Sequence, residues 1–321
     1  MAFLKSQLLF KPPYPTTSFS SQTIIVTGSN TGLGREAARH FSRLDAAKLI
    51  LAVRNTTAGE AAKKDILSTT RREESSIEVW PLDLSSFDSI RAFAERCKRE
   101  LPRIDVLLEN AGVAMTTYTM EKNGHEKTIM VNVIGTFYLA LLLVPHLKEA
   151  AKRFAITPRL TIVSSEVHGF TKFPVRNEPN IFEALKENRK EYFKDRYQDS
   201  KLLEVLVVRQ LAPKLEGSGV VLNMLNPGLC HSELSRDGPF VLEVIKFLLA
   251  RSTEVGSRTL VASAAAGSES HGKYMSDAMV KEEALSPFVR SKESKESGEK
   301  VWRELRDILE AEQPGVTEVV R

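Results

Sequence analysis

The sequence predicts an α/β fold: a doubly wound parallel sheet of about seven strands, with helices on both of its faces. Three observations lead to this prediction. Short β-branched apolar runs alternate along the chain with segments of helical periodicity. A glycine-rich turn joins the first such run to the first helical segment. The 321 residues are 42% hydrophobic and 27% charged, an ordinary balance for a globular chain that buries a sizeable core.

The predicted elements follow one another in regular alternation. Residues 23–27 (TIIVT) and 48–53 (KLILAV) are rich in the branched side chains that favour buried strands. Apolar residues recur at steps of three and four between 90 and 101, as in an amphipathic helix. On the same grounds we predict further strands at 77–82, 106–110, 160–164 and 220–225, and helices at 35–44, 59–68, 89–100, 126–147, 195–211 and up to about residue 310.

We expect one domain over residues 22–312, with an arm before it and a tail after it. The arm, residues 1–21, contains Pro12, Pro13 and Pro15 and no long apolar core, so it is neither a signal peptide nor a spanning helix. We expect it to pack on the domain surface. Inside the domain, an insertion covers about 170–192 and a substrate lid about 229–250. The tail, 313–321, looks loose.

Composition and charge exclude several classes of function. The net charge of +4 is small and the charges are mixed, so we expect no nucleic-acid partner. Cys97 and Cys230 are the only cysteines, which gives no disulfide framework and no metal-ligand spacing; we expect no metal and a cytoplasmic location. The longest apolar stretch, 134–147, is shorter than the roughly 18 residues of a membrane span and fits a buried helix.

Two motifs carry chemistry. The turn TGSNTGLG, residues 27–34, lies between a predicted strand and a predicted helix, where glycines permit close approach of a phosphate to the helix N-terminus. Tyr197 and Lys201 are four residues apart on a predicted helix and therefore share a face. A neighbouring ammonium lowers the pKa of a phenol, which suits the pair to proton transfer. An ordinary tight turn and a surface Tyr–Lys pair are the alternatives.

Taken together with further motifs, these residues resemble the short-chain dehydrogenase/reductases over about residues 22–280, which implies a Rossmann-type sheet. The other motifs in family order are Asn110-Ala111-Gly112, Asn132, Ser164–Ser165 and Asn226-Pro227-Gly228. Arg54 and the SEVH sequence at 165–168 resemble the retinol-dehydrogenase-like branch. The N-terminal stretch and NPGLCHSEL are similar to reductases of fungal secondary metabolism.

The resemblance implies a role for each catalytic residue. Tyr197 is the expected general acid/base, and Lys201 lowers its pKa and binds the nicotinamide ribose. Ser165 orients the substrate oxygen, with Ser164 as the rival for that role. Asn132 holds a water that links Lys201 to solvent. Two hydroxyl donors beside a carbonyl oxygen stabilise the negative charge that reduction places on it.

The resemblance also assigns residues to the cofactor. Val53, and not a carboxylate, ends the second strand, and Arg54 follows, so we expect NADP(H) to be preferred over NAD(H). Arg35 adds positive potential. Asp83 either binds the adenine edge or caps the following helix. The expected cofactor-binding set is Gly28, Ser29, Asn30, Gly32, Leu33, Gly34, Arg54, Asp83, Asn110, Ala111, Gly112, Tyr197, Lys201, Pro227 and Gly228.

Three features depart from the family pattern or stay open. Glu109 replaces the usual asparagine before the Asn-Ala-Gly triplet, which puts a sheet-to-turn hydrogen bond in doubt. Ser165 and Tyr197 are 32 residues apart, and the insertion between them either folds over the edge of the site or forms a surface loop. His168 either faces the substrate or simply packs and hydrogen-bonds.

We therefore expect an NADP(H)-dependent oxidoreductase that interconverts a ketone or aldehyde and an alcohol on a small hydrophobic substrate. In the lid, Phe240, Leu242 and Phe247 are expected to line the pocket; a dimer contact or a membrane-surface helix is the alternative for this segment. The rival functions are a non-catalytic nucleotide sensor, an epimerase or dehydratase, and a membrane-bound retinoid enzyme. A homo-oligomer and a peripheral membrane contact stay open.

Overall fold

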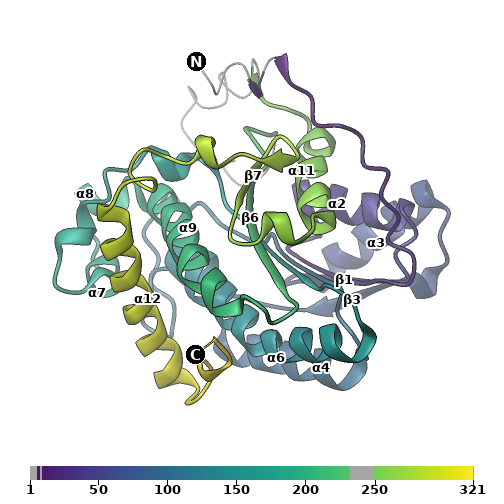
Figure 1. Cartoon of the computed structure of the whole chain (residues 1–321), viewed down its shortest axis with the longest axis horizontal. Coiled ribbons are helices and arrows are strands. Elements are labelled where there is room, and N and C mark those ends of the chain that lie inside the picture. The colour runs from purple at the N-terminus through teal and green to yellow at the C-terminus, as the bar shows by residue number, and fades with distance from the viewer. Residues whose placement is uncertain (1–5, 8, 232–248, 321) are drawn as a thin grey trace.

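The fold is an α/β sheet structure, seen in a computed structural model that describes residues 6–7, 9–231 and 249–320 (Figure 1). Within these residues the sheet has eight strands in the order β3-β2-β1-β4-β5-β6-β7-β8. All neighbouring pairs are parallel except β7–β8. The order reverses between β1 and β4, which makes the sheet doubly wound. The predicted fold class is confirmed, and the sheet has eight strands among the described residues where about seven were expected.

The six strands predicted from the sequence lie within one residue of their expected ends. They are rich in fully buried aliphatic side chains because helices cover both faces of the sheet. The prediction missed β7 and β8, which have only three and two residues. The strands are β1 Thr23–Thr27, β2 Lys48–Val53, β3 Ile77–Pro81, β4 Val106–Glu109, β5 Arg159–Val163, β6 Val221–Asn226, β7 Tyr274–Ser276 and β8 Met279–Val280.

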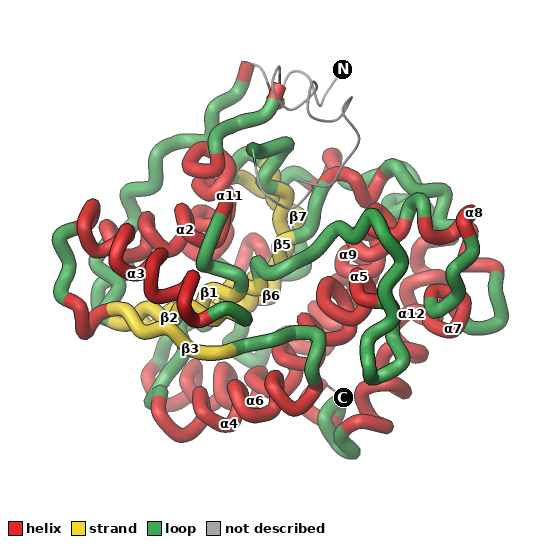
Figure 2. Tube along the Cα trace, turned by 180° about the vertical axis from the view of Figure 1, so that it is seen from behind, coloured by secondary structure: helices red, strands yellow, loops and turns green. Residues whose placement is uncertain are grey.

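Helices form one layer on each face of the sheet (Figure 2). One core packs α2 Gly32–Arg43, α3 Thr56–Thr70 and α11 Thr253–Ala265 against side chains such as Ile24 and Val26. The other packs α4 Phe87–Glu100, α6 Thr136–Phe154 and α9 Arg196–Leu215 against Ile25 and Leu107. A final helix, α12 Glu293–Glu312, lies along α9 (Figure 1). Alternate side chains of each strand therefore enter different cores.

The helix predicted over 126–147 is interrupted. A short α5, Lys127–Ile129, leads into a π-helical turn, Met130–Gly135, before α6 begins. The Thr136 hydroxyl donates to the Val131 carbonyl at 3.0 Å. Over Lys127–Phe154 the most apolar window has a mean hydropathy of 2.0, and 94% of it is buried in the protein. The helix is longer than the predicted stretch 134–147 and is long and apolar enough to span a membrane, but its burial fits a core helix.

The segment around 170–192 is ordered and attached to α12 and α9 (Figure 1). Glu304 of α12 accepts hydrogen bonds from the backbone N–H groups of Ile181 and Phe182, and Arg196 of α9 donates to the Leu185 carbonyl at 2.5 Å. Ile181 and Phe182 are at most 1% exposed. The segment is part of the core and not a loose surface loop. Its elements are η4 Pro174–Asn177, α7 Ile181–Leu185 and α8 Lys190–Phe193, after η3 Glu166–Gly169.

Both ends of the described chain are packed. Arg258 donates to the Pro12 carbonyl at 2.9 Å, and Phe19, 1% exposed, stacks edge-on against Phe41. The expectation of a surface-packed arm holds for its described residues. The expectation of a loose C-terminal tail is wrong. Residues 316–320 are tied to Glu310 and to α6, where Lys148 donates to the Val319 carbonyl at 2.6 Å, and the chain ends in η8 Glu318–Val320.

The contact between α12 and α7 gives a test of how the 170–192 segment is held. Glu304→Ala removes the acceptor of two buried backbone N–H groups and should cost about 1–3 kcal/mol of unfolding free energy. Urea unfolding measures the loss. Glu299→Ala, an exposed position on the same helix, is the control and should change stability by less than about 0.5 kcal/mol. Equal losses in the two variants would contradict this account.

Candidate active site

The glycine-rich turn lies where β1 ends and the strand order reverses. Gly28 has a φ of +64°, and a Cβ atom on it would lie 2.9 Å from the Ala111 Cα. Gly32 has a φ of +59°, and nothing lies within 4 Å of where its Cβ would be. The turn therefore approaches the chain after β4 at Gly28 and is open at Gly32. An open glycine position of this kind lets a dinucleotide phosphate come close to the backbone.

The helix α2 begins within this turn, and no side chain caps its first N–H groups. Its N-cap residue, Thr31, forms no side-chain hydrogen bond to the helix, and the first turn contains no acidic residue. The first N–H groups of the helix are thus free of a side-chain cap and can receive a pyrophosphate. Asn30 and Leu33 are partly exposed beside them. The turn and the helix fit the predicted dinucleotide.

Hydrogen bonds fasten the turn to the end of β4. The Thr27 hydroxyl oxygen accepts from the backbone N–H groups of Asn110 and Ala111, each at 2.9 Å, and the Asn110 amide donates to the Thr27 carbonyl at 2.8 Å. One expected cofactor contact needs correction. Ser29 is fully buried, and its hydroxyl donates to the Val26 carbonyl at 2.9 Å, so it holds the turn from inside.

Tyr197 and Lys201 lie on the first turns of α9, which pass the carboxyl end of β5 and the loop after β4. The Lys201 Nζ is 5.8 Å from the Tyr197 ring centre and donates to the Val163 carbonyl at 2.9 Å. A Cβ atom on Gly112 would lie 3.7 Å from the Lys201 Nζ and 3.3 Å from the Asn132 Oδ1. The structure therefore brings Lys201, Gly112 and Asn132 together from three separate elements.

The two serines after β5 have different surroundings. The Ser164 side chain is buried, and its hydroxyl donates to the Lys201 carbonyl at 3.0 Å. Ser165 is partly exposed and hydrogen-bonds to Tyr197; burial raises the pKa of Tyr197, and the hydrogen bond to Ser165 is among the contacts that oppose this rise. Ser165 is thus the hydroxyl that shares a space with Tyr197, and Ser164 is a structural contact of α9.

Asn132 lies in the π-helical turn, where it is fully buried. Its Oδ1 accepts from the Val113 N–H at 2.8 Å, and its amide donates to the Val113 carbonyl and the Ser200 hydroxyl, both at 2.9 Å. These bonds hold the loop after Gly112 against α9. A π-helical turn changes the backbone hydrogen bonds of a helix and often marks a functional site. Whether Asn132 also holds a water for Lys201 stays a prediction.

His168 is buried and hydrogen-bonds through both ring nitrogens. Its Nδ1 lies 2.7 Å from the Ser165 carbonyl, and its Nε2 accepts from the Ser286 N–H at 3.0 Å. Since one ring nitrogen must donate and the other accept, the imidazole is neutral with its proton on Nδ1. Burial also lowers the pKa of His168. The ring therefore fixes the backbone of Ser165.

The charges around Tyr197 include a carboxylate that the sequence analysis did not single out. Glu204, one turn after Lys201 on α9, accepts from the Lys201 Nζ at 2.7 Å. Burial lowers the pKa of Lys201, but Glu204 and Tyr197 more than offset this and the pKa is raised. Burial raises the pKa of Tyr197, which Lys201 opposes and Glu204 reinforces. The spacing of 201 and 204 was a signal for this contact, since residues three apart on a helix are neighbours.

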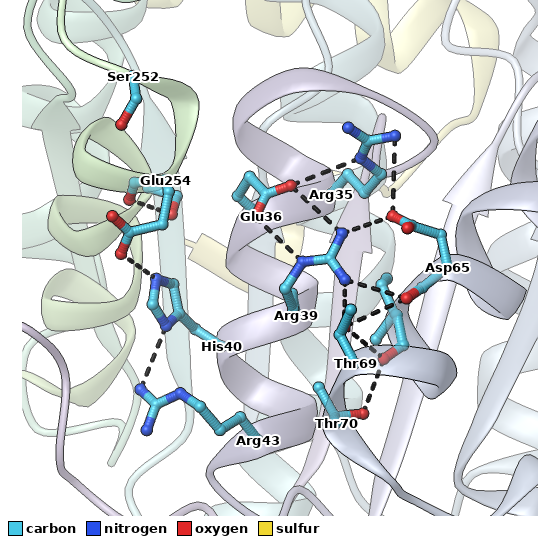
Figure 3. Close-up of polar contacts among 12 residues, drawn as sticks. Arg35, Glu36, Arg39, His40, Arg43, Asp65, Thr69, Thr70, Ser252 and Glu254 are labelled. Atoms are coloured by element: carbon cyan, nitrogen blue, oxygen red, sulfur yellow. Dashed lines mark hydrogen bonds and ion pairs between the residues drawn. The ribbon is translucent and has the colours of Figure 1, made fainter.

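The end of β2 carries the residues that bear on cofactor choice. Arg54 is exposed and forms no hydrogen bond or ion pair with the described residues. The Arg35 Nε lies 3.6 Å from the Glu36 Oε1, and its Nη1 lies 3.9 Å from the Asp65 Oδ2 (Figure 3). Arg39 forms ion pairs with the same two carboxylates. The positive charge of Arg35 is therefore compensated, and Arg54 is the free guanidinium at this end of the sheet.

Two further predicted cofactor contacts are placed but stay predictions. Asp83 accepts from the backbone N–H and the hydroxyl of Ser85, at 2.9 and 2.7 Å, and is partly exposed, so it orders the turn before α4 and leaves its other oxygen accessible. Gly228 follows β6 with a φ of +81°, and a Cβ on it would meet Gln7 and Arg251. The expected lid residues Phe240, Leu242 and Phe247 lie outside the described residues.

Among the described residues, no group of three or more His, Cys, Asp and Glu side chains is arranged to hold a metal ion. Cys97 and Cys230 are both buried free thiols.

Known proteins resemble this chain closely. The sequence pattern of the short chain dehydrogenase family matches residues 22–158. The short chain dehydrogenase/reductase dmxR8 of Cryptosporiopsis sp. is 50% identical, over 99% of both chains. The short-chain dehydrogenase anuD of Penicillium roqueforti is 42% identical, over 98% of this chain and 84% of its own.

Solved structures share the fold. A putative uncharacterized protein from Mycobacterium paratuberculosis superposes with a TM-score of 0.66 at 27% identity, over 92% of this chain and 96% of its own. The RhlG protein of Pseudomonas aeruginosa, in its NADP active-site complex, has a TM-score of 0.60 at 22% identity, over 82% of this chain and 97% of its own. The predicted similarity to fungal short-chain dehydrogenases and the Rossmann-type sheet are confirmed.

Glu109 gives a test of the site's electrostatics. The Thr27 hydroxyl reaches its carboxylate at 3.3 Å, one carboxylate oxygen has no partner, and burial raises the pKa to about 8. An unfolded Glu titrates near 4.3. Between these pH values the folded state binds the extra proton, so the stability contributed by Glu109 falls as pH rises toward 8.

Glu109→Gln removes this penalty and should raise the melting temperature at pH 8 but much less at pH 5. A gain of 1 kcal/mol corresponds to about 2–4 °C for a chain of this size class. Thermal melts at both pH values measure the difference, with the exposed Glu60→Gln as the control. A gain that is the same at pH 5 and pH 8 would show that Glu109 is not the titrating group.

Proposed function

The chain belongs to the short-chain dehydrogenase/reductase family, and we propose that it is an NADP(H)-dependent enzyme that interconverts a ketone or aldehyde and an alcohol on a small hydrophobic substrate. As a member of this family it is an oxidoreductase whose fold binds NAD(P). The observation that carries the proposal is the joint position of Ser165, Tyr197 and Lys201 beside Gly112. The nicotinamide, when bound, supplies or accepts the hydride.

The side chains divide the remaining work. Ser165 and Tyr197 present two hydroxyl groups to the substrate oxygen, and these stabilise the negative charge that grows on it during reduction. The Tyr197 phenol donates its proton to that oxygen, or takes it back in alcohol oxidation. Lys201, held by Val163 and Glu204, keeps a positive charge near the phenol and leaves one N–H free for the ribose. Asn132 fixes the loop that positions Gly112.

Arg54 supports the choice of NADP(H). Its guanidinium is exposed and unpaired among the described residues at the end of β2, where NAD-preferring sites have a carboxylate. A guanidinium matches a 2′-phosphate in charge and in geometry. RhlG, a fold relative, holds NADP in its own active site. The fungal relatives support a role in fungal secondary metabolism. The cytoplasmic location remains part of the proposal.

Two rival functions fit the residues less well. A nucleotide sensor without catalysis has no need of Ser165, Tyr197 and Lys201 in one cluster with a buried lysine. An epimerase or dehydratase shares the Tyr–Lys pair, but such enzymes build a larger substrate domain after the last Gly of the sheet. Here the described part of the chain after Gly228 consists mainly of α11, two short strands and α12. Neither rival has an observation in its favour.

Tyr197→Phe tests the proposed chemistry. The variant loses only the acidic hydroxyl, so turnover should fall at least about a hundredfold while the dissociation constant for NADPH stays within about threefold. Steady-state rates on a panel of carbonyl and alcohol substrates, beside a fluorescence titration with NADPH, provide the measurement. Tyr192→Phe is the control, because that phenol binds Glu178 away from the site. Wild-type turnover in Tyr197→Phe would refute the mechanism.

Arg54→Ala tests the cofactor preference. Wild-type protein should have the higher kcat/KM with NADPH. The variant should lose about 10- to 100-fold in NADPH affinity, as expected for a lost hydrogen bond between charged groups, and change little with NADH. Arg290→Ala, at an exposed arginine far from β2 in sequence, should leave both affinities unchanged. A wild-type preference for NADH, or equal losses for both cofactors, would rule out the assignment.

A further inference from the structure

The Lys201 ammonium has a buried carboxylate as its direct partner. The Lys201 Nζ lies 2.7 Å from the Glu204 Oε1, and the two side chains are only 6% and 2% exposed. A second proton of the ammonium goes to the Val163 carbonyl at 2.9 Å. An ammonium has three protons, so one is left on the side of Gly112. Glu204 thus orients the lysine as well as carrying the opposite charge.

Burial raises the pKa of Glu204 to about 7, and Lys201 and Ser164 oppose this rise. When the carboxylate is ionised the pair is neutral overall, and this changes what Lys201 can do to its neighbour. A buried ammonium without a partner loses its charge or destabilises the fold by several kcal/mol. With Glu204 beside it, Lys201 keeps its proton. The same carboxylate opposes the effect of Lys201 on Tyr197: the lysine lowers the pKa of the phenol, whereas Glu204 raises it. Since burial also raises it, the phenol remains protonated well above neutral pH.

Other titratable groups face this cluster from neighbouring elements. Tyr274 of β7 is fully buried, and its hydroxyl has no partner among the described residues. Burial raises the pKa of Tyr274, and the charges of Glu166 and Glu204 raise it further. Burial raises the pKa of Glu166, on η3, to about 7. Three other buried carboxylates lie on or beside α9: Glu126 lies 3.9 Å from Arg196, Asp199 accepts from Thr171, and Glu304 accepts from the backbone of α7. Burial raises the pKa of Asp199 to about 7, and its second oxygen has no partner among the described residues.

We propose that Glu204 is a positioning residue of the reaction: its buried carboxylate anchors and neutralises the Lys201 ammonium, so that Tyr197 is held as a proton donor for carbonyl reduction. Glu204 does not touch the substrate and acts only through Lys201 and Tyr197. The inference rests on the proposed function, because it takes Tyr197 as the group that transfers the proton. It adds a charge that sets the pH range in which the phenol can donate.

The test compares wild-type protein with Glu204→Gln, which keeps the size and an oxygen acceptor but removes the charge. The first readout is kcat/KM for alcohol oxidation against pH, using an alcohol found in the substrate panel. The second is the near-ultraviolet absorbance of tyrosinate against pH, taken as the difference between each protein and its Tyr197→Phe counterpart. In Glu204→Gln the amide oxygen and the Val163 carbonyl still accept hydrogen bonds from the ammonium, so Lys201 keeps its proton. Both readouts should then move by about one unit to lower pH, as expected when one nearby negative charge is removed.

Two further variants separate a charge effect from a structural one. Glu204→Asp keeps the charge and should return both pH readouts most of the way to wild type. Glu304→Gln removes a buried carboxylate that binds the backbone of α7 and should change stability without moving either readout. The expected pattern is a shift in Glu204→Gln alone.

The proposal is overturned if either readout of Glu204→Gln stays at the wild-type pH or moves to higher pH, or if Glu304→Gln shifts them equally. These results differ from a failure of the proposed function. That failure appears as wild-type turnover in Tyr197→Phe, whatever Glu204→Gln does. If Tyr197→Phe is inactive and Glu204→Gln has no effect on pH dependence, the function stands and only the role of Glu204 is refuted.

Discussion

The site depends on the hydrogen bonds that join the end of β1 to the chain after β4. The Thr27 hydroxyl oxygen accepts hydrogen bonds from the backbone N–H groups of Asn110 and Ala111. The Asn110 side-chain amide donates to the carbonyls of Thr27 and Gly28. These bonds satisfy polar groups that would otherwise be buried without partners where the strands end. They also fix the glycine turn against the Asn-Ala-Gly loop. Without them the turn before α2 and the loop that carries Gly112 would have no defined relative position.

The second constraint is the free-energy cost of burying the positive charge of Lys201. Lys201 is almost fully buried, and α9 supplies Glu204 one turn away to keep it charged. The same helix presents Tyr197 on the neighbouring turn. A single helix therefore holds the phenol, the Lys201 charge that lowers its pKa and the Glu204 charge that raises it. Ser165 comes from the end of β5, where His168 fixes its backbone. The chemistry therefore comes from α9, and the sheet supplies the frame around it.

Around this centre the chain adds contacts that fix the shape of one flank. The 170–192 segment and α12 hold one another through Glu304, and the C-terminal residues close over α6 through Lys148. On the other side, the described arm residue Gln7 donates to the carbonyls of Leu229 and Leu249, at 2.5 and 3.0 Å. These two residues flank the stretch expected to cover the substrate. These contacts thus join segments that are remote in sequence.

The sequence by itself determined the alternation of strands and helices, the parallel sheet and the identity of the Tyr197–Lys201 pair, because each depends on local periodicity or on spacing within one helix. It left Ser164 and Ser165 as rivals and gave Ser29 a ligand contact. Only the tertiary structure decided these points, since a side chain's partner depends on which strand or helix packs against it. The same reason explains the firmly packed C-terminal residues and the buried Glu204. A carboxylate near a lysine is common on helices, and it becomes a constraint on catalysis only when the fold removes both from water.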